Sequence, residues 1–168
     1  RKARPAVTVT YSSYLHLDEL LAAQRPLSDG PEHDEMLFIV IHQVYELWFK
    51  QLLHEATHLG SALDEDNLPR VYATLKRFLT ILKVQVAQID ILETMSPISF
   101  LSFRSRLDTA SGFQSPQFRE LEFVLGRRSA RMIAHHDGTP AAARLAARLA
   151  EPSLWDTFVR FLARHGYD

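Results

Sequence analysis

Apolar residues recur along the chain at spacings of three and four, which is the period of one face of an α-helix. The spacing of two that is typical of half-buried strands is not the prevailing pattern. Gly is scarce, at 6 of the 168 residues, whereas the strong helix formers Leu and Ala are abundant. The pattern predicts an all-α protein built as a helical bundle.

Two long helices are predicted at the centre of this bundle. The first extends from about residue 31 to residue 59, with an acidic first turn that suits the positive end of the helix dipole and with Gly60 just past its end. Its middle is apolar on nearly every face, so we expect it to be buried. The second begins after Asn67, a typical N-cap, with Pro69 in its first turn, and continues to about residue 92.

Shorter helices are predicted on both sides of this pair. The Ser-Pro sequences at 96–97 and 115–116 are typical helix starts, because Ser caps the first turn and Pro fits within it. The loop at 108–114 between the two helices that they start is a natural ligand contact. The shorter helices are predicted at 18–24, 97–107, 116–125 and 153–165, with a basic helix and an Ala/Arg-rich helix before the last of them.

Composition narrows the functional classes. Hydrophobic residues make up 46% of the chain and charged residues 23%, which is ordinary for a globular protein and argues against disorder. Lys and Arg total 19 against 20 for Asp and Glu, so no overall field attracts nucleic acid or an anionic membrane. The absence of Cys excludes thiol nucleophiles and thiolate metal sites.

We expect a single domain over residues 1–168. The longest apolar run, at 36–41, is far shorter than the roughly 18 residues of a membrane-spanning helix, and the polar start is no signal peptide, so the expected location is the cytoplasm. Gly166 lies where a helix stop would normally lead into another element. We therefore also expect that this domain lacks its C-terminal part.

The first candidate for chemistry is the zinc-protease pattern His54-Glu55-Ala56-Thr57-His58. On a helix this pattern places two imidazoles one turn apart, with a carboxylate between them as general base. No third His or Glu follows at the spacing that the known zinc proteases use, and no sheet precedes the helix. The alternative, which we favour, is that both His are solvated beside Glu55.

The second candidate is His42, in the most apolar part of the chain. Phe38 lies four residues before it and Tyr45 three residues after it, on the same helical face. One interpretation is a hydrogen-bonded core histidine. The other is that Phe38 forms a flat wall for a planar ligand while His42 hydrogen-bonds the edge of that ligand.

Arg104 and three residues near the start of the chain complete the candidates. Arg104 precedes the 108–114 loop on a largely apolar helix, where its guanidinium would suit a ligand carboxylate or a structural ion pair. Tyr11, Tyr14 and Leu15 lie in an otherwise polar arm. Aromatic residues in such an arm are expected to bury against the core of the subunit or in a pocket of a neighbouring one.

Four stretches, taken in order, resemble the tryptophan 2,3-dioxygenase family. They are Tyr11-Ser-Ser-Tyr14-Leu15, the run HDEMLFIVIHQVYELW at 33–48, Phe103-Arg104, and Ser111-Gly112-Phe113-Gln114-Ser115. The resemblance continues from about Tyr11 to the end of the chain, and it is more specific than the five-residue zinc pattern.

The resemblance implies an all-helical, homotetrameric haem b enzyme of tryptophan catabolism through the kynurenine pathway. Such an enzyme inserts both atoms of O₂ across the indole C2–C3 bond of L-tryptophan to give N-formylkynurenine. His42 matches the distal histidine that faces the indole N–H, and Phe38 matches the aromatic residue that lines the indole pocket. Arg104 matches the residue that binds the substrate carboxylate.

Further matches imply contacts with a neighbouring subunit and with haem. Tyr11, Tyr14 and Leu15 match an arm that reaches into the pocket of the neighbour and contacts its substrate. Ser111 and Gly112 match a loop over the haem edge, and Phe100 is placed with them among the candidate haem contacts.

Two departures from the family pattern qualify these expectations. No residue matches the proximal haem ligand, and nothing places the histidines at 135, 136 and 165 opposite His42, so we assign no metal ligand. Phe100 stands where the family often has a Tyr that helps to hold the substrate carboxylate, a loss of about 1.5–3 kcal/mol at most. A related enzyme acting on another indole or aromatic amino acid therefore stays open, as does the zinc hydrolase of His54, Glu55 and His58.

Overall fold

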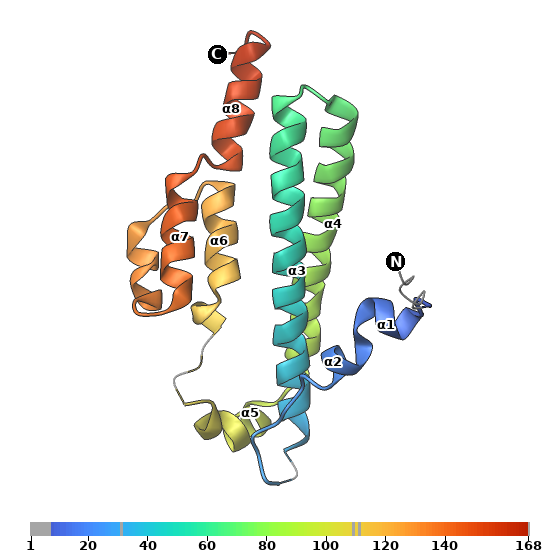
Figure 1. The fold of residues 1–168 in the computed structure, drawn as a ribbon. Coiled ribbons are helices and arrows are strands. Elements are labelled where there is room, and N and C mark those ends of the chain that lie inside the picture. Colours follow the sequence, from blue (N-terminus) through green and yellow to red (C-terminus); the bar gives the residue numbers. More distant parts are fainter. Residues whose placement is uncertain (1–7, 31, 109, 111, 168) are drawn as a thin grey trace, which may run out of the picture.

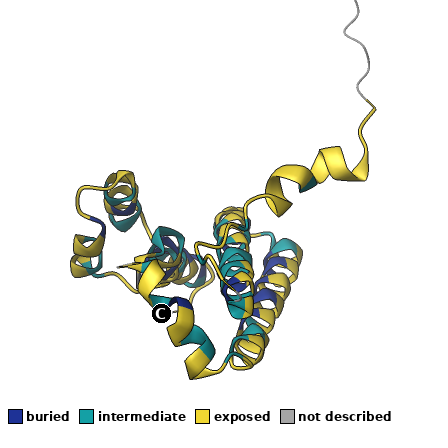
Figure 2. Ribbon diagram, turned by 90° about the horizontal axis from the view of Figure 1, so that it is seen from below, coloured by how far each residue is buried: buried dark blue, intermediate teal, exposed yellow. Residues whose placement is uncertain are grey.

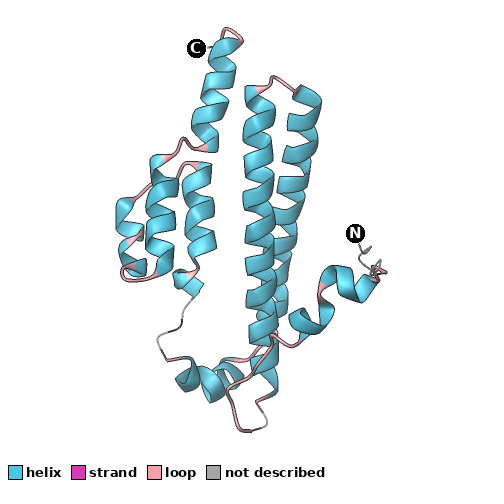
Figure 3. Ribbon diagram, in the orientation of Figure 1, coloured by secondary structure: helices cyan, strands magenta, loops and turns pink. Residues whose placement is uncertain are grey.

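The computed structural model describes residues 8–30, 32–108, 110 and 112–167. Its regular structure is helical, and no strand occurs in these residues (Figure 3), so the all-α prediction is confirmed. No helix among them is long and apolar enough to cross a membrane. The α-helices are α1 (Tyr11–Leu15), α2 (Leu17–Leu21), α3 (His33–Asp64), α4 (Leu68–Leu92), α5 (Pro97–Arg104), α6 (Pro116–Leu125), α7 (Pro140–Ala150) and α8 (Leu154–Arg164).

The antiparallel pair α3 and α4 forms the centre of the molecule (Figure 1). Helices α6 and α8 pack on α3 away from α4, with α7 against α6, and α5 contacts α3 near its N-terminal end. Because α3 is contacted by α4, α5, α6 and α8, its predicted central position is confirmed. Its middle is less covered than predicted, since residues 42–51 are half-buried or exposed.

Helix α3 is longer at its C-terminal end than the sequence predicted. It continues past Gly60 to Asp64, so the predicted end at residue 59 was wrong. A Cβ added at Gly60 would meet nothing within 4 Å, so this glycine serves no close approach. The helix continues because Leu59, Ala62 and Leu63 are buried against α4 and α8, which outweighs the penalty of about 1 kcal/mol for a helical Gly.

The predicted helix starts at Asn67, Ser96 and Ser115 are confirmed. The Asn67 side chain accepts a hydrogen bond from the backbone N–H of Arg70 at 3.2 Å, and Ser96 and Ser115 do the same within their own helices. Residues 105–107 continue α5 as a 3₁₀ turn, which accounts for the predicted length of 97–107. Ser153 and Asp156 form a capping box that starts α8.

The N-terminal segment differs from the prediction of one helix at 18–24. Residues 11–15, which the sequence suggested as an arm, form α1, whose first turn is closed by a capping box of Thr10 and Ser13. His16 follows with a left-handed φ of 51° and separates α1 from α2. Apart from a few half-buried positions, this segment is exposed and projects from the bundle (Figure 2).

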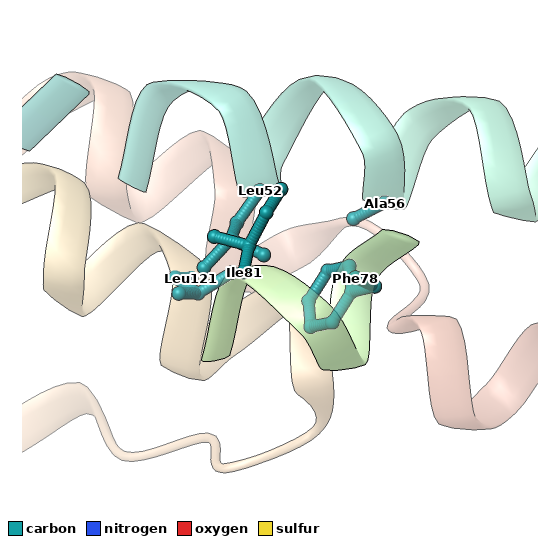
Figure 4. Packing of buried hydrophobic residues seen from close by; sticks show 5 residues of the cluster. All are labelled: Leu52, Ala56, Phe78, Ile81 and Leu121. Carbon is teal, nitrogen blue, oxygen red and sulfur yellow. The ribbon is translucent and has the colours of Figure 1, made fainter. Parts of the chain in front are cut away.

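Two apolar clusters hold the long helices together. The first joins α3 and α4 to α6 and consists of Leu52, Ala56, Phe78, Ile81 and Leu121 (Figure 4). The second lies at the other end of the pair, where the last turns of α3 meet Val71 of α4 and Phe161 of α8. Both clusters lie on the second half of α3, leaving its first half less tightly covered.

Candidate functional site

Two cavities meet at His42 on the first half of α3. The first, of about 330 Å³, lies between α3, α6 and the turn before α6, and we call it the α3–α6 pocket. The second, of about 390 Å³, lies between α3, α6 and the α2 region. The α3–α6 pocket is lined by His42, Tyr45, Glu46, Phe49, Gly112, Ser115, Phe118 and Arg119.

The hydrogen bond of His42 determines which of its ring nitrogens can accept from a ligand. Nδ1 lies 2.7 Å from the backbone carbonyl oxygen of Phe38. A carbonyl only accepts, so Nδ1 carries the proton, and the neutral ring presents the lone pair of Nε2. His42 is therefore hydrogen-bonded within its own helix, as one interpretation expected, and it also lines an open cavity. The ligand-binding interpretation stays a prediction.

Phe38 joins His42 to an aromatic cluster formed with α5. The ring centroids of Phe38 and His42 are 4.1 Å apart, and the Phe38 ring lies 5.8 Å from Phe100 and 5.6 Å from Phe103. Phe103 is completely buried. The structure thus brings together three of the predicted site residues, Phe38, His42 and Phe100, and fixes them on a packed support.

Arg104 ends α5 immediately after this cluster. Its Nη1 donates to the backbone carbonyl of Asp108 at 2.9 Å, and the side chain is half-buried. No carboxylate in the described residues forms an ion pair with Arg104, so the ion-pair alternative finds no support there. The guanidinium keeps further N–H donors for a ligand anion.

The remaining predicted residues fall into three groups. Gly112 lines the α3–α6 pocket with His42, whereas Ser111 lies outside the described residues. Tyr11, Tyr14 and Leu15 lie on α1, with exposed fractions of 77%, 75% and 40%, and do not line the pocket of their own chain. These side chains are not buried in their own chain, so the surface that would bury them would belong to another chain.

Sequence analysis named Tyr45 but missed Phe49 and Phe118, with which Tyr45 forms a second aromatic wall of the α3–α6 pocket. Phe49 lies between Tyr45 and Phe118, with ring centroids 6.0 Å and 5.3 Å away. Tyr45 donates a hydrogen bond to the backbone carbonyl of Gln85 at 2.6 Å, and burial raises the pKa of its hydroxyl. Positions 45 and 49 lie three and seven residues after His42, so the helical period that singled out Phe38 also contained this signal.

Polar groups that line the two cavities were also missed. Gln117 donates to the Glu46 carboxylate at 2.7 Å and to the Glu46 backbone carbonyl at 3.0 Å, which ties α6 to α3. Arg119 pairs with Glu122 at 2.5 Å and lies 5.0 Å from the centre of the Phe118 ring. The sequence pattern did not distinguish these residues from ordinary polar surface positions. The partner of Gln117 lies on another helix, and the pairing of Arg119 one turn along its own helix is common on helix surfaces.

Known proteins similar to the chain identify its family. A family profile described as tryptophan 2,3-dioxygenase matches residues 2–142. The chain belongs to the tryptophan 2,3-dioxygenase family. It is 59% identical over 165 residues to a tryptophan 2,3-dioxygenase of Anaeromyxobacter dehalogenans, covering 97% of the chain and 61% of that protein. The relative from Herpetosiphon aurantiacus is 55% identical over 159 residues, covering 95% of the chain and 61% of that protein.

The chain therefore spans about 61% of the length of these tryptophan 2,3-dioxygenases. The family resemblance drawn from the sequence motifs is confirmed, and with it the fold class. A third relative, from Nocardioides, is 53% identical over 95% of the chain and has the same name.

In this structure the carboxylate of the zinc-protease pattern is engaged in contacts within the helix pair. Glu55 is buried on the side of α3 that faces α4, where both carboxylate oxygens accept from Arg77 at 3.1 Å and one accepts from Gln51 at 2.7 Å. The prediction that His54 and His58 are solvated is confirmed, because both are exposed, whereas Glu55 between them is buried. No group of three or more possible metal ligands occurs in the described residues.

The structure does not bring the histidines at 135, 136 and 165 into the cavities that His42 lines. None of them lines the α3–α6 pocket. His136 is buried, and burial, followed by the charges of Arg119 and His135, lowers its pKa. His165 is bonded through Nδ1 to the backbone carbonyl of Phe161 in α8, at 2.9 Å.

Proposed function

We propose that the chain supplies the substrate-facing wall of a haem-dependent tryptophan 2,3-dioxygenase. The reaction inserts both atoms of O₂ across the indole C2–C3 bond of L-tryptophan and gives N-formylkynurenine. The observation that carries the proposal is His42, which lines an aromatic pocket, bonds its own helix through Nδ1 and packs its ring on Phe38. The names of the similar proteins support the same activity.

The pocket residues fit one face of a haem. Phe49 and Phe118 would offer flat apolar walls to the haem, Gly112 would leave room at its edge, and Arg119, which is paired with Glu122, would offer its remaining N–H donors to a haem carboxylate. We include Ser111 and Phe100 in this set because of the family match. When bound, haem would supply the iron on which O₂ is activated.

His42 is proposed to orient the indole rather than to deprotonate it. Its Nε2 accepts a hydrogen bond in the neutral tautomer, and the indole N–H is a donor. The indole N–H is a very weak acid, and a neutral imidazole is too weak a base to ionise it to a useful extent. The hydrogen bond instead holds the C2–C3 edge in one position while Phe38 supports the ring face.

Arg104 is proposed to bind the substrate carboxylate. Its position after the buried Phe103, which contacts Phe38, connects the carboxylate site rigidly to the aromatic wall. Phe100 contributes no hydroxyl to this site, so the arginine would provide most of the specificity for an amino acid over a bare indole.

Tyr11, Tyr14 and Leu15 are proposed to complete the substrate site of a neighbouring subunit in a homotetramer. Their exposure on a helix that projects from the bundle supports this role, because large aromatic side chains in that position gain stability by burial against another chain. We also propose that residues 1–168 form one domain with the fold described above.

The decisive test is the absorbance spectrum of the purified protein, reduced and free of oxygen, with and without L-tryptophan. We expect a haem Soret band that shifts when tryptophan is added and that shifts much less in the Arg104→Leu variant. Absence of haem, or a shift that Arg104→Leu leaves unchanged, would contradict the proposed site in this chain.

A related enzyme that acts on another indole or aromatic amino acid is the second candidate, and Phe100 is the observation that favours it. The same spectral titration with L-tryptophan, tryptamine and indole separates the two. Tryptamine lacks the carboxylate, so equal affinity for tryptamine and L-tryptophan would remove Arg104 from the substrate site.

A further inference from the structure

Few contacts hold the N-terminal arm, which consists of α1 and α2, to its own chain. Within the described residues, these two helices contact each other, and neither makes more than a slight contact with any other helix. Most side chains of the arm are exposed, including those of Tyr11 and Tyr14. Because apolar packing contributes so little here, the polar contacts at the base of the arm determine where it lies.

The side-chain amide of Gln43 on α3 makes two of these polar contacts. Its Oε1 accepts a hydrogen bond from Nε2 of Gln24 at 2.5 Å, and its Nε2 donates to the backbone carbonyl of Ala23 at 3.1 Å. Ala23 and Gln24 lie just past the end of α2, where a backbone carbonyl has no helical partner. The amide therefore binds the end of the arm with a donor and an acceptor at once. We call this pair of hydrogen bonds the Gln43 clasp.

A second anchor lies further from the arm. The buried Glu35 carboxylate accepts hydrogen bonds from the backbone N–H groups of Leu27 at 2.6 Å and Ser28 at 3.0 Å, and Arg106 donates to the Leu27 carbonyl at 3.3 Å. Among residues 18–30 only Gln24 and Ser28 are half-buried, one at each anchor, and the others are exposed. Two side chains make the second anchor, whereas the clasp depends on Gln43 alone.

The clasp lies beside the candidate substrate site of its own chain. Gln43 directly follows His42, and consecutive residues of an α-helix point about 100° apart. His42 therefore lines the α3–α6 pocket while Gln43 reaches the base of the arm. Both residues line the second cavity, together with Leu20 and Ala23. One turn of α3 thus carries both a candidate indole contact and the attachment of the arm.

The position of the clasp at the base gives it leverage over the tip of the arm. Tyr11 and Tyr14 lie on α1, the far helix of the arm, which projects from the bundle (Figure 2). A small rotation at the base therefore displaces these side chains by a larger distance. A contact to substrate is sensitive to misplacement of about 1 Å, so the clasp controls whether the tip can reach its target.

We propose that Gln43 is a positioning residue for the substrate site of the neighbouring subunit, and that it acts through the clasp on the arm of its own chain. This assignment rests on the proposed function, in which the arm completes that neighbouring site. Gln43 itself contacts no substrate. Its loss leaves His42 and Arg104 in place in its own chain but frees the arm, so substrate binding weakens in the neighbour.

Steady-state kinetics of the holoenzyme tests the clasp. Gln43→Leu removes both hydrogen bonds at nearly constant size and should raise KM for L-tryptophan about threefold to tenfold, with kcat and haem content nearly unchanged. Gln24→Leu removes one of these bonds from the arm and should raise KM in the same direction. The double variant should match Gln43→Leu, because the bond between the two side chains is then already lost.

A matched control makes the same chemical change elsewhere. Gln88 is half-buried on α4 and lines neither cavity at His42, so Gln88→Leu should keep the original KM. Hydrogen–deuterium exchange gives a readout independent of turnover. Exchange should become faster at residues 17–24 in Gln43→Leu and stay unchanged at residues 52–59 in the packed half of α3. Circular dichroism confirms that every variant is folded.

Mixed oligomers show in which subunit Gln43 acts. Co-expression with two different affinity tags yields oligomers that contain both Gln43→Leu and Arg104→Leu chains. A Gln43→Leu chain keeps Arg104 in its own site and receives an intact arm from an Arg104→Leu neighbour. Such sites should regain the original KM, and they make up about a quarter to a half of all sites in a mixed tetramer. Oligomers of either variant alone contain no such site.

Three outcomes would overturn the proposal. The first is an unchanged KM in Gln43→Leu and Gln24→Leu. The second is a fall in kcat at unchanged KM, which would show that Gln43 acts through His42 in its own chain. The third is a mixed oligomer without sites of the original KM. Failure of the proposed function has a different signature, namely protein without haem or the original KM in Arg104→Leu alone.

Discussion

The two halves of α3 share one continuous helix but are used in different ways. In the first half only Glu35 and Ile41 are buried, and His42 and Tyr45 line open cavities. In the second half six residues are buried, including Leu52 and Glu55. The contrast explains why the two histidine patterns of this helix differ: His42 keeps a lone pair for a ligand, whereas the carboxylate of the zinc-protease pattern is already bonded to Arg77.

The two halves of α3 differ because different elements pack on them. The second half is covered by α4, α6 and α8 through two apolar clusters, so its side chains have fixed partners. The first half meets α5 and the α6 start over aromatic rings that leave a cavity between them. A ligand site needs such a gap, and a packed core excludes one.

The largest expected effect comes from the packed half. Leu52→Ala removes a fully buried side chain at the centre of the first cluster and should lower the free energy of unfolding by about 2–5 kcal/mol. Urea denaturation measures it. Leu47→Ala, at a half-exposed position of the open half, is the control and should cost well under half as much; equal losses would remove the distinction between the halves.

Arg104→Leu tests the open half at its carboxylate end. Loss of a charge-assisted contact should raise KM for L-tryptophan at least tenfold, corresponding to about 1.5–3 kcal/mol, with the haem content unchanged. Steady-state kinetics of the haem-loaded enzyme measures this, and Arg106→Leu is the neighbouring control. An unchanged KM would contradict the assigned role.

Glu35 anchors the start of the open half. Burial raises the pKa of its carboxyl, but hydrogen bonds from Ser28 and Leu27, with the charge of Arg106, lower it by more, so the net shift is downward. The Glu35 carboxylate therefore stabilises the fold fully at pH values above its ordinary pKa of about 4.5. This stabilisation is lost as the pH falls through the lowered pKa of the folded state.

Glu35→Gln should accordingly destabilise the protein by about 1.5 kcal/mol at neutral pH and flatten the acid limb of the stability curve. The midpoint of urea denaturation, measured at several pH values from 7 down to about 3, checks this. A variant as pH-dependent as the original protein would show that another carboxylate controls the acid limb.

His42→Ala tests the hydrogen bond to the indole. A single neutral hydrogen bond contributes about 0.5–1.5 kcal/mol, so turnover should fall by up to about tenfold without being abolished. The residual rate separates an orienting role from that of an essential base. Turnover at the original rate would remove His42 from the substrate site.

His54→Ala is expected to have the smallest effect. The side chain is exposed on the packed half of α3, so stability and turnover should both stay within about 0.5 kcal/mol of the original. Loss of activity in this variant, with zinc in the purified protein, would revive the hydrolase that the burial of Glu55 argues against.

Much of the fold could be predicted from signals that act between residues close together in the sequence. Asn67, Ser96 and Ser115 act within three residues of their own positions, so their helix starts could be predicted exactly. The end of α3 could not, because Gly60 is locally a stop signal and only the distant Val71 and Phe161 make continuation favourable.

The sequence by itself determined the helical class, the helix starts, the family and the candidates Phe38, His42 and Arg104, because all of these are expressed in residue types at short spacings. Only the tertiary structure decided which candidates meet. It brought Phe100 onto Phe38, turned Glu55 toward Arg77 and left Tyr11 and Tyr14 outside the pocket of their own chain. Burial and partner choice depend on contacts between residues far apart in the chain, and a periodic pattern does not contain those contacts.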